Sequence, residues 1–110
     1  MENCIFCKII KGEIPSNKVF ENKKIVAFYD INPKAKVHIL IIPKIHIESI
    51  KDLEEKDKSL IGELILATQR IAREKNLGGY KIVVNVGREG GQIVNHLHVH
   101  LLSGDVVLGV

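Results

Sequence analysis

The sequence has few cysteines and no long apolar run, and each of these absences excludes a class of protein. Its two cysteines lie three residues apart with no other thiol to pair with, so the chain is not a disulfide scaffold. The apolar run 39–42 is far shorter than the roughly 20 residues of a membrane span, and the first residues lack the apolar centre of a signal peptide. We therefore expect a cytoplasmic protein with no membrane partner.

Basic residues are not massed into an arm or a tail. The net charge is only +3 at pH 7, and lysines and arginines are scattered singly or in pairs. This pattern argues against a long nucleic-acid surface, so we expect no nucleic-acid partner. Since the 110 residues contain no linker, internal repeat or low-complexity tract, we expect a single domain over residues 1–110.

Apolar spacing predicts one short helix, one long helix and several strands. Asn3 is a candidate cap for a short helix that stops at Gly12 and Pro15, and a long helix is predicted over about 52–75. Runs of β-branched and aromatic residues predict strands at 24–31, 37–42, 80–86 and 96–102. The first two of these strands are joined by a short turn, which favours an antiparallel hairpin. This order of elements is typical of an α+β domain with helices packed on a mainly antiparallel sheet.

The strand 37–42 is apolar on both faces. Val37, Ile39 and Ile41 alternate with His38, Leu40 and Ile42, so each face of the sheet needs a cover. A second copy of the chain, forming a homodimer, would supply the cover that the helices do not.

Three histidines alternate with aliphatic residues near the end of the chain. In an extended strand His96, His98 and His100 project to one face, and adjacent members lie ~6.5 to 7 Å apart. Neighbouring members can share one phosphate or one metal ion, but the outer two lie too far apart for all three to meet at one centre. A neutral imidazole is also a good nucleophile toward phosphorus, and a neighbouring imidazolium can neutralise phosphate charge. A solvated histidine face and a pure metal site are the alternatives.

A glycine-rich segment, 87–92, precedes the histidines, and Asn85 stands just before it. Paired glycines let backbone N–H groups approach phosphate oxygens closely. A glycine turn that merely joins two strands is the commoner explanation of such a segment taken alone.

With these residues in view, the sequence resembles the histidine-triad (HIT) family, and within it the nucleoside phosphoramidases of the Hint branch. The matching motifs are ordered over nearly the whole chain: CIFCKII at 4–10, GEIP at 12–15, AFYDINP at 27–33, HILIIPKIH at 38–46, VVNVG at 83–87, GGQ at 90–92 and HLHVH at 96–100. The resemblance implies a HIT-like five-stranded sheet continued across a homodimer. It also implies a purine nucleotide site and hydrolysis of nucleoside 5′-monophosphate derivatives through a nucleotidyl-histidine intermediate.

The resemblance also implies roles for single residues. His98 matches the nucleophile, and His100 and His38 match its partners around the phosphate. Asp30 matches the carboxylate that holds the ribose hydroxyls. The remaining matches line the nucleotide. Ile31 lies beside the ribose, and Asn85, Gly91 and Gln92 lie around the phosphate. The walls of the base pocket are Ile5, Phe6, Ile9, Ile14 and Phe28, although a role as ordinary core residues is equally expected for Ile9 and Ile14.

Two positions and the C-terminal ending depart from the family pattern. Ile93, at a nucleotide-binding position, stands where the Hint branch usually has a serine whose hydroxyl assists the leaving group. Val37 replaces a frequent Gly or Thr, and the Trp-Pro-Pro-Gly ending of animal members is absent. The leaving-group preference is therefore not carried over from the family.

Cys4 and Cys7 are either reduced thiols or half of a structural metal site. A structural zinc takes four N or S ligands. If three of the five histidines serve the phosphate, His46 and His96 remain as candidate ligands. The resemblance implies the same set, because microbial members of the family hold zinc with two cysteines and two histidines at the matching positions. We expect structural zinc at Cys4, Cys7, His46 and His96.

Three other functions compete with phosphoramidate hydrolysis. The nearest is hydrolysis of dinucleoside polyphosphates by the same residues. The second is a zinc-stabilised nucleotide-binding module that acts through a partner, with little catalysis. The third, a metalloenzyme with an open metal among the histidines, is disfavoured because the cysteine pair and the alternating spacing divide the ligands into two sites.

Overall fold

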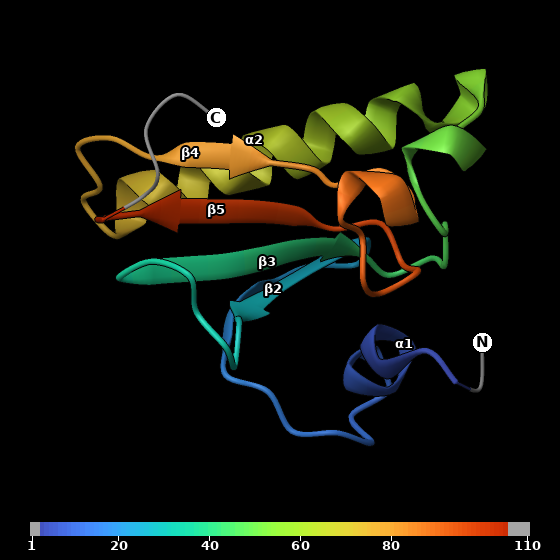
Figure 1. Cartoon of the computed structure of the whole chain (residues 1–110), viewed down its shortest axis with the longest axis horizontal. Helices are drawn as coiled ribbons and strands as arrows, with labels where there is room; N and C mark the ends of the chain where they lie inside the picture. The colour runs from blue at the N-terminus through green and yellow to red at the C-terminus, as the bar shows by residue number, and fades with distance from the viewer. Residues whose placement is uncertain (1–2, 106–110) are drawn as a thin grey trace.

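Five antiparallel strands form one sheet in the order β1-β2-β3-β5-β4, and a long helix lies across one face of it (Figure 1). The structure is a computed structural model and describes residues 3–105. The predicted α+β class, five-stranded sheet, long helix and short N-terminal helix are confirmed. In chain order the elements are α1 (Ile5–Ile10), β1 (Lys18–Glu21), β2 (Ile25–Tyr29), β3 (Val37–Pro43), α2 (Lys58–Glu74), β4 (Lys81–Val83) and β5 (Val99–Ser103), with short 3-10 turns at Ile50–Asp52, Glu55–Asp57 and Arg88–Gly90.

Cys4 caps helix α1, in place of the predicted Asn3. The Cys4 Sγ accepts a hydrogen bond of 3.3 Å from the backbone N–H of Cys7, and this satisfies one of the donors that a helix leaves unpaired at its first turn. The prediction for Asn3 is wrong because the thiol one residue later takes the capping position. Both sulfurs are thereby held close together at one end of α1.

Strand β1 is the one strand of the described residues that apolar spacing failed to predict. It has only four residues, with charged Lys18 and Glu21 at its ends and half-buried Val19 and Phe20 between them. Alternation over so few residues gives no usable period. The hairpin of β2 and β3 is confirmed, and β3 continues one residue further than predicted, through Pro43.

Strand β5 begins at Val99, so the predicted strand 96–102 is wrong at its start. Ile41 pairs with Val99, and two residues further along β3 stands Pro43, which has no N–H to donate. The Pro43 carbonyl accepts instead from the Nε2 of His96 at 2.8 Å, so the ladder cannot continue to Leu97. His96 and His98 therefore precede the strand, and the three imidazoles do not share one strand face.

Helix α2 begins at Lys58, six residues later than predicted. Just before α2, the Glu54 N–H donates to the Asp57 carboxylate at 2.9 Å, as one of two reciprocal hydrogen bonds between these residues. This pair marks a turn of the chain and not a continuing helix. None of the helices in residues 3–105 has the length and apolar character needed to cross a lipid bilayer.

Both faces of β3 are buried, as its sequence predicted. Ile39 and Ile41 pack in the core that includes Leu64 of α2. Leu40 and Ile42 lie in a second cluster with Phe6, Ile9, Val26 and Phe28. Helix α1 thus covers part of the second face from within the same chain, and the homodimer stays a prediction.

Candidate functional site

A cavity of about 640 Å³ opens on the sheet face opposite α2. This volume is within the usual range for sites that bind small molecules. The cavity brings together nearly every residue predicted to contact a nucleotide. Of those predicted residues, it is lined by Ile5, Phe6, Ile9, Ile14, Phe28, Asp30, Ile31, His38, Asn85, Gly91, Ile93, His98 and His100.

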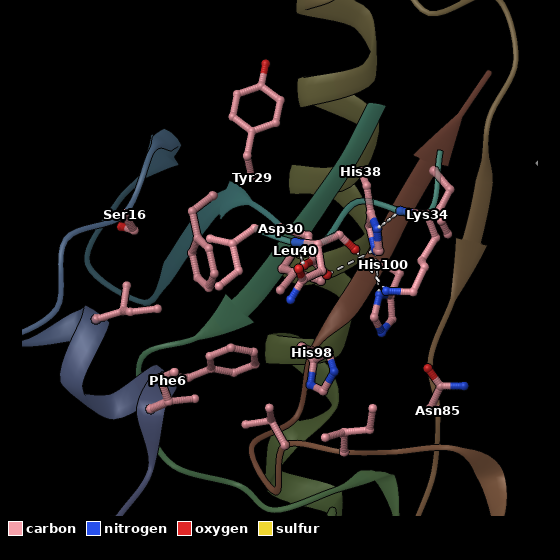
Figure 2. Close-up of a pocket in the computed structure, with 18 of the residues that line it drawn as sticks. Phe6, Ser16, Tyr29, Asp30, Lys34, His38, Leu40, Asn85, His98 and His100 are labelled. Carbon is pink, nitrogen blue, oxygen red and sulfur yellow. Dashed lines mark hydrogen bonds and ion pairs between the residues drawn. The ribbon is translucent and has the colours of Figure 1, made fainter. Parts of the chain in front are cut away.

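One end of the cavity is apolar and aromatic. Ile5, Phe6 and Ile9 come from α1, and Phe28 comes from β2. The rings of Phe6 and Phe28 meet edge to face, with centroids 5.6 Å apart. Figure 2 shows Phe6 on one side of His98 and Asn85 on the other, so the histidine lies between the apolar and the polar end.

His98 presents one ring nitrogen to the cavity in a defined chemical form. Its Nδ1 lies 2.6 Å from the backbone carbonyl oxygen of His96, and since a carbonyl only accepts, Nδ1 carries the proton. In the neutral ring the lone pair then belongs to Nε2. Burial lowers the pKa of His98, although the bond to His96 and the nearby Asp30 oppose this shift. His98 is therefore held as a neutral imidazole with a nucleophilic Nε2.

His38 and His100 form a hydrogen-bonded pair whose direction is set by the backbone. The Lys34 N–H donates to His38 Nδ1 at 3.0 Å, so the proton of neutral His38 is on Nε2. That Nε2 donates to His100 Nδ1 at 2.9 Å (Figure 2). His100 consequently carries its own proton on Nε2, which is buried and has no hydrogen-bond partner among the described residues.

Burial and the two neighbouring histidines lower the pKa of His100 to about 4. Burial also lowers the pKa of His38, against the opposing effect of Asp30. His100 is thus neutral at pH 7. A charged ring would be poorly solvated at this buried position. In the neutral state His100 offers an N–H donor that has no partner among residues 3–105.

Asp30 stands at the end of β2, beside the histidine pair. Its Oδ1 accepts the N–H of Asn32 at 2.8 Å, and its Oδ2 lies 3.5 Å from His38 Nε2. A carboxylate held in this way is an acceptor suited to hydroxyl groups.

The glycine-rich segment forms a tight loop at the polar end of the cavity. Gly91 has a φ of 89°, which side chains with a Cβ rarely adopt, and the Asn85 side chain donates to the carbonyl of Gly90 at 2.9 Å. Gln92 is buried and does not line the cavity. Its amide accepts from the Gly87 N–H at 2.9 Å and donates to the carbonyls of Glu48 and Val94, so it supports the loop from behind.

Two isoleucines lie at the open rim. Ile31 is 86% exposed and Ile93 is 92% exposed, although both line the cavity. Large apolar side chains this exposed at a cavity mouth are available to a ligand.

Several lining residues were missed by sequence reasoning. Leu40 follows His38 on the same face of β3, and Leu102 follows His100 on the same face of β5, so alternation would have found both. Lys81 and Val83 pair with Leu102 and His100, a register that the sequence alone did not provide. The other missed lining residues are Pro15, Ser16, Tyr29, Asn32, Lys34 and Val94.

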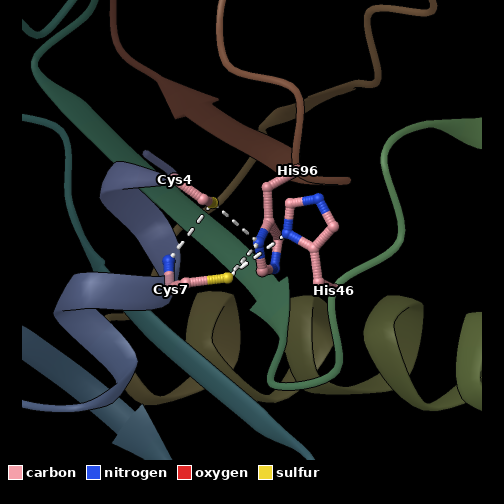
Figure 3. Close-up of side chains that lie close together, drawn as sticks. All are labelled: Cys4, Cys7, His46 and His96. Carbon is pink, nitrogen blue, oxygen red and sulfur yellow. Dashed lines mark hydrogen bonds between the residues drawn. The ribbon is translucent and has the colours of Figure 1, made fainter. Parts of the chain in front are cut away.

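A second cluster brings Cys4, Cys7, His46 and His96 together (Figure 3). Their ligand atoms all lie within 4.8 Å of one another. The Nδ1 of His96 lies 3.3 Å from Cys4 Sγ and 3.6 Å from Cys7 Sγ, and the Nδ1 of His46 lies 3.3 Å from Cys7 Sγ. Zinc bond lengths with tetrahedral angles place sulfur and nitrogen ligands about 3.5 Å apart. The spacing therefore fits a four-ligand metal site.

The protonation of His96 also fits a metal ligand. Its Nε2–H donates to the Pro43 carbonyl, so the Nδ1 lone pair faces the sulfurs. A carbonyl on the far nitrogen is the usual support of a metal-binding histidine. The group of Asp30, His38 and His100 is also close enough to surround an ion, but there His38 Nε2 carries a proton and cannot ligate without losing its bond to the Lys34 backbone.

Comparisons with known proteins identify the family. The family model described as "Scavenger mRNA decapping enzyme C-term binding" matches residues 3–108. The protein HitA of Neisseria gonorrhoeae is 43% identical over 107 residues, which cover 96% of this chain and 100% of HitA. The chain belongs to the histidine-triad family.

Solved HIT structures have the same fold. A HIT family hydrolase from Legionella pneumophila Philadelphia 1 superimposes with a TM-score of 0.94 at 46% identity, covering 97% of both chains. A histidine triad protein from Clostridium difficile gives 0.95 at 41% identity, covering 100% of this chain and 97% of the other. The similarity to HIT structures therefore extends over the whole described fold.

Proposed function

We propose that this HIT protein is a hydrolase that cleaves purine nucleoside 5′-monophosphate derivatives, such as phosphoramidates and aminoacyl or acyl nucleotides. The observation that carries the proposal is the state of His98, which the His96 carbonyl fixes as a neutral ring with Nε2 as the lone-pair nitrogen. Family membership supports it, since relatives of known structure from Legionella pneumophila and Clostridium thermocellum are described as HIT family hydrolases.

In the proposed first step, His98 Nε2 attacks the α-phosphorus. A bond forms between nitrogen and phosphorus, and the bond to the leaving group breaks with its electron pair on the departing atom, which takes a proton from water as it leaves. The buried Nε2–H of His100 is the donor available to a phosphate oxygen as the five-coordinate centre forms. Water then attacks the phosphorus, releases the nucleoside monophosphate and returns His98 to its starting form.

We assign the rest of the substrate by the chemistry of the cavity walls. The purine would lie against the apolar end formed by Ile5, Phe6 and Phe28, and the ribose hydroxyls would donate to Asp30 beside Ile31. The phosphate would meet Asn85 and the Gly91 backbone. Ile93 would lie near the leaving group, and Gln92 would contribute by holding the loop in shape.

We propose zinc as the ion for Cys4, Cys7, His46 and His96. Four nitrogen and sulfur ligands leave no open position, so the role assigned to the ion is structural. When bound, it would supply a fixed point that joins α1 to the segments after β3 and before β5.

We also propose that the protein is a homodimer whose sheet continues across the interface. Strand β4 is at one edge of the sheet, where a strand of a second copy would extend it. Ile82 on β4 and Leu66 on α2 are 41% and 63% exposed, and they would be covered by a second copy.

A substrate panel tests the function. We expect turnover of adenosine and guanosine phosphoramidates to exceed that of dinucleoside polyphosphates on one preparation. His98→Ala should lower kcat by about 10³-fold or more and still bind AMP, because the base and ribose contacts remain. Quenching in alkali, where a phosphorus–nitrogen bond to histidine survives, should trap a nucleotide on the wild-type chain only. Faster cleavage of dinucleotides would favour the rival hydrolase, and tight AMP binding without any turnover would favour a binding module.

A further inference from the structure

Residue 96 contacts both the other residues of the metal cluster and His98, the proposed nucleophile. Its imidazole Nδ1 lies 3.3 Å from Cys4 Sγ, and its backbone carbonyl accepts the His98 Nδ1–H at 2.6 Å. The same carbonyl decides which nitrogen of His98 keeps its lone pair. Any movement of the residue 96 backbone therefore changes the direction of the His98 ring.

Helix α1 makes a second connection between the two sites. Phe6 stands in the sequence between Cys4 and Cys7, so the two sulfur ligands hold the turn that carries it. Its ring packs edge to face on His98 with centroids 5.1 Å apart and on His96 with centroids 5.8 Å apart. Phe6 also lines the cavity, so the position of this one side chain is shared by the cluster and the apolar pocket.

The segment that carries the nucleophile is buried but lies outside the sheet ladder. His96 and His98 lie outside the strands, so no ladder fixes their backbone. The Leu97 N–H donates to the carbonyl of Ile47 at 2.7 Å, and Ile47 follows the ligand His46 directly. The ligands sit on three parts of the chain: α1 with the residue before it, the segment after β3 and the segment before β5 (Figure 3).

We propose that the metal cluster positions the nucleophile, with His96 and Phe6 as positioning residues. The bound ion fixes the His96 carbonyl and the edge of Phe6, and these two groups aim His98 Nε2 at the phosphorus. This inference rests on the proposed hydrolysis, and it assigns the cluster a catalytic consequence beyond holding the fold. The α2 face of the sheet has its own core, so we expect the chain to stay folded when the ion is lost.

Removing the metal from reduced wild-type protein with a chelator is the first test. We expect kcat to fall about 10- to 100-fold, as supporting groups around catalytic and metal sites typically contribute, while the Kd for AMP rises by a smaller factor. The ring N–H signal of His98 in proton NMR at fixed pH should broaden or vanish because its hydrogen bond is no longer held. Added Zn²⁺ should restore all three. A folded, metal-free chain that keeps the signal and its turnover would overturn the proposal.

Two matched variants test the route with the metal bound. His96→Cys and His46→Cys each leave three cysteines and one histidine, a set that still holds zinc. A cysteine ligand is shorter than histidine, so the backbone at the substituted position must move toward the ion. Only residue 96 carries the carbonyl bound to His98, so His96→Cys should lower kcat by about tenfold or more and shift the His98 ring signal. His46→Cys reaches His98 only indirectly, through the bond between Ile47 and Leu97, so its effect on both should be clearly smaller.

Equal turnover and equal His98 spectra in the two zinc-loaded variants would contradict the inference, even if the metal-free chain unfolds. Metal content and thermal unfolding establish that each variant is loaded and folded. A failure of the proposed hydrolysis can be distinguished from a failure of this inference. If the hydrolysis proposal fails, the wild-type protein shows no turnover, but the His98 ring signal and AMP binding can still be measured.

Discussion

His38 Nε2 donates to His100 Nδ1 across 2.9 Å, and the backbone N–H of Lys34 makes this the only direction in which the proton can point. The pair therefore acts as a fixed relay of hydrogen bonds. It ends at the Nε2–H of His100, which has no hydrogen-bond partner within residues 3–105 and lies in the cavity that contains His98.

We expect the contributions of His38 and His100 to turnover to be coupled. His100→Ala removes the donor and should lower kcat by about 10²- to 10³-fold. His38→Ala leaves His100 free to place its proton on Nδ1 and should cost a smaller factor. Because both act through one N–H, the double variant should lose no more than His100→Ala alone. Losses that multiply in the double variant would mean that the two residues act separately.

Ile93→Ser should change the leaving-group dependence of the reaction. A hydroxyl at this position can donate to a departing amine, which the isoleucine cannot. We expect kcat to rise for poor leaving groups such as alkylamines and to change little for good ones, while stability stays within about 0.5 kcal/mol because the side chain is exposed. Ile31→Ser, at the equally exposed ribose side, is the control and should affect KM alone. An identical leaving-group profile in wild type and Ile93→Ser would contradict the assignment.

Protein purified without added metal should contain about one zinc per chain, measured by atomic emission. Cys4→Ser and Cys7→Ser should each lose the ion and lower Tm, because binding to the folded state alone stabilises it. Asn3→Ala, beside the cluster but not part of it, should keep both. Unchanged metal content in Cys4→Ser would rule out the four-ligand site.

Stability should fall as the pH drops from about 6.5 toward 4. The ordinary histidine pKa of 6.5 is lowered to about 4 at His100 by burial and by His98 and His38. Between these values the unfolded chain binds a proton at this residue and the folded chain does not, so acid favours unfolding. Denaturant titrations of wild type and His100→Gln should show a shallower slope in the variant over this range. The difference in stability between wild type and His100→Gln excludes the effect of acid on the metal ligands, which both proteins share. Parallel curves of stability against pH would contradict the burial of a neutral His100.

Ile82→Arg should convert a dimer to a monomer, measured by light scattering after size exclusion. A charge on the edge strand β4 opposes pairing with a second copy. Ile45→Arg, at another exposed isoleucine away from β4, should leave the oligomer unchanged. A wild-type protein that is monomeric at high concentration would contradict the proposed interface.

Side-chain alternation predicted the sheet where a strand was long and buried, and failed where it was short or interrupted. Strand β3 has seven residues, of which all but the half-buried Val37 are buried, so its position was clear from composition. Lys18–Glu21 has four residues with charged ends and could not be distinguished from a loop.

The histidine row shows a different limit. The spacing of His96, His98 and His100 indicated a strand, yet the strand stops because Pro43 on the neighbouring strand cannot donate. Pairing partners far apart in sequence are not visible in a single segment. The resemblance to a family, and not the periodicity, separated His96 from the other two and added the distant His38.

The carboxamide of Gln92 already makes three hydrogen bonds, which join Gly87 at the start of the glycine-rich loop to the backbone of Val94 and of Glu48. A loop tied in this way loses little conformational entropy when an anion arrives. Association with nucleotide should therefore proceed at a rate set by diffusion and orientation, without a slow closing step, and the temperature dependence of binding should carry no signature of loop ordering.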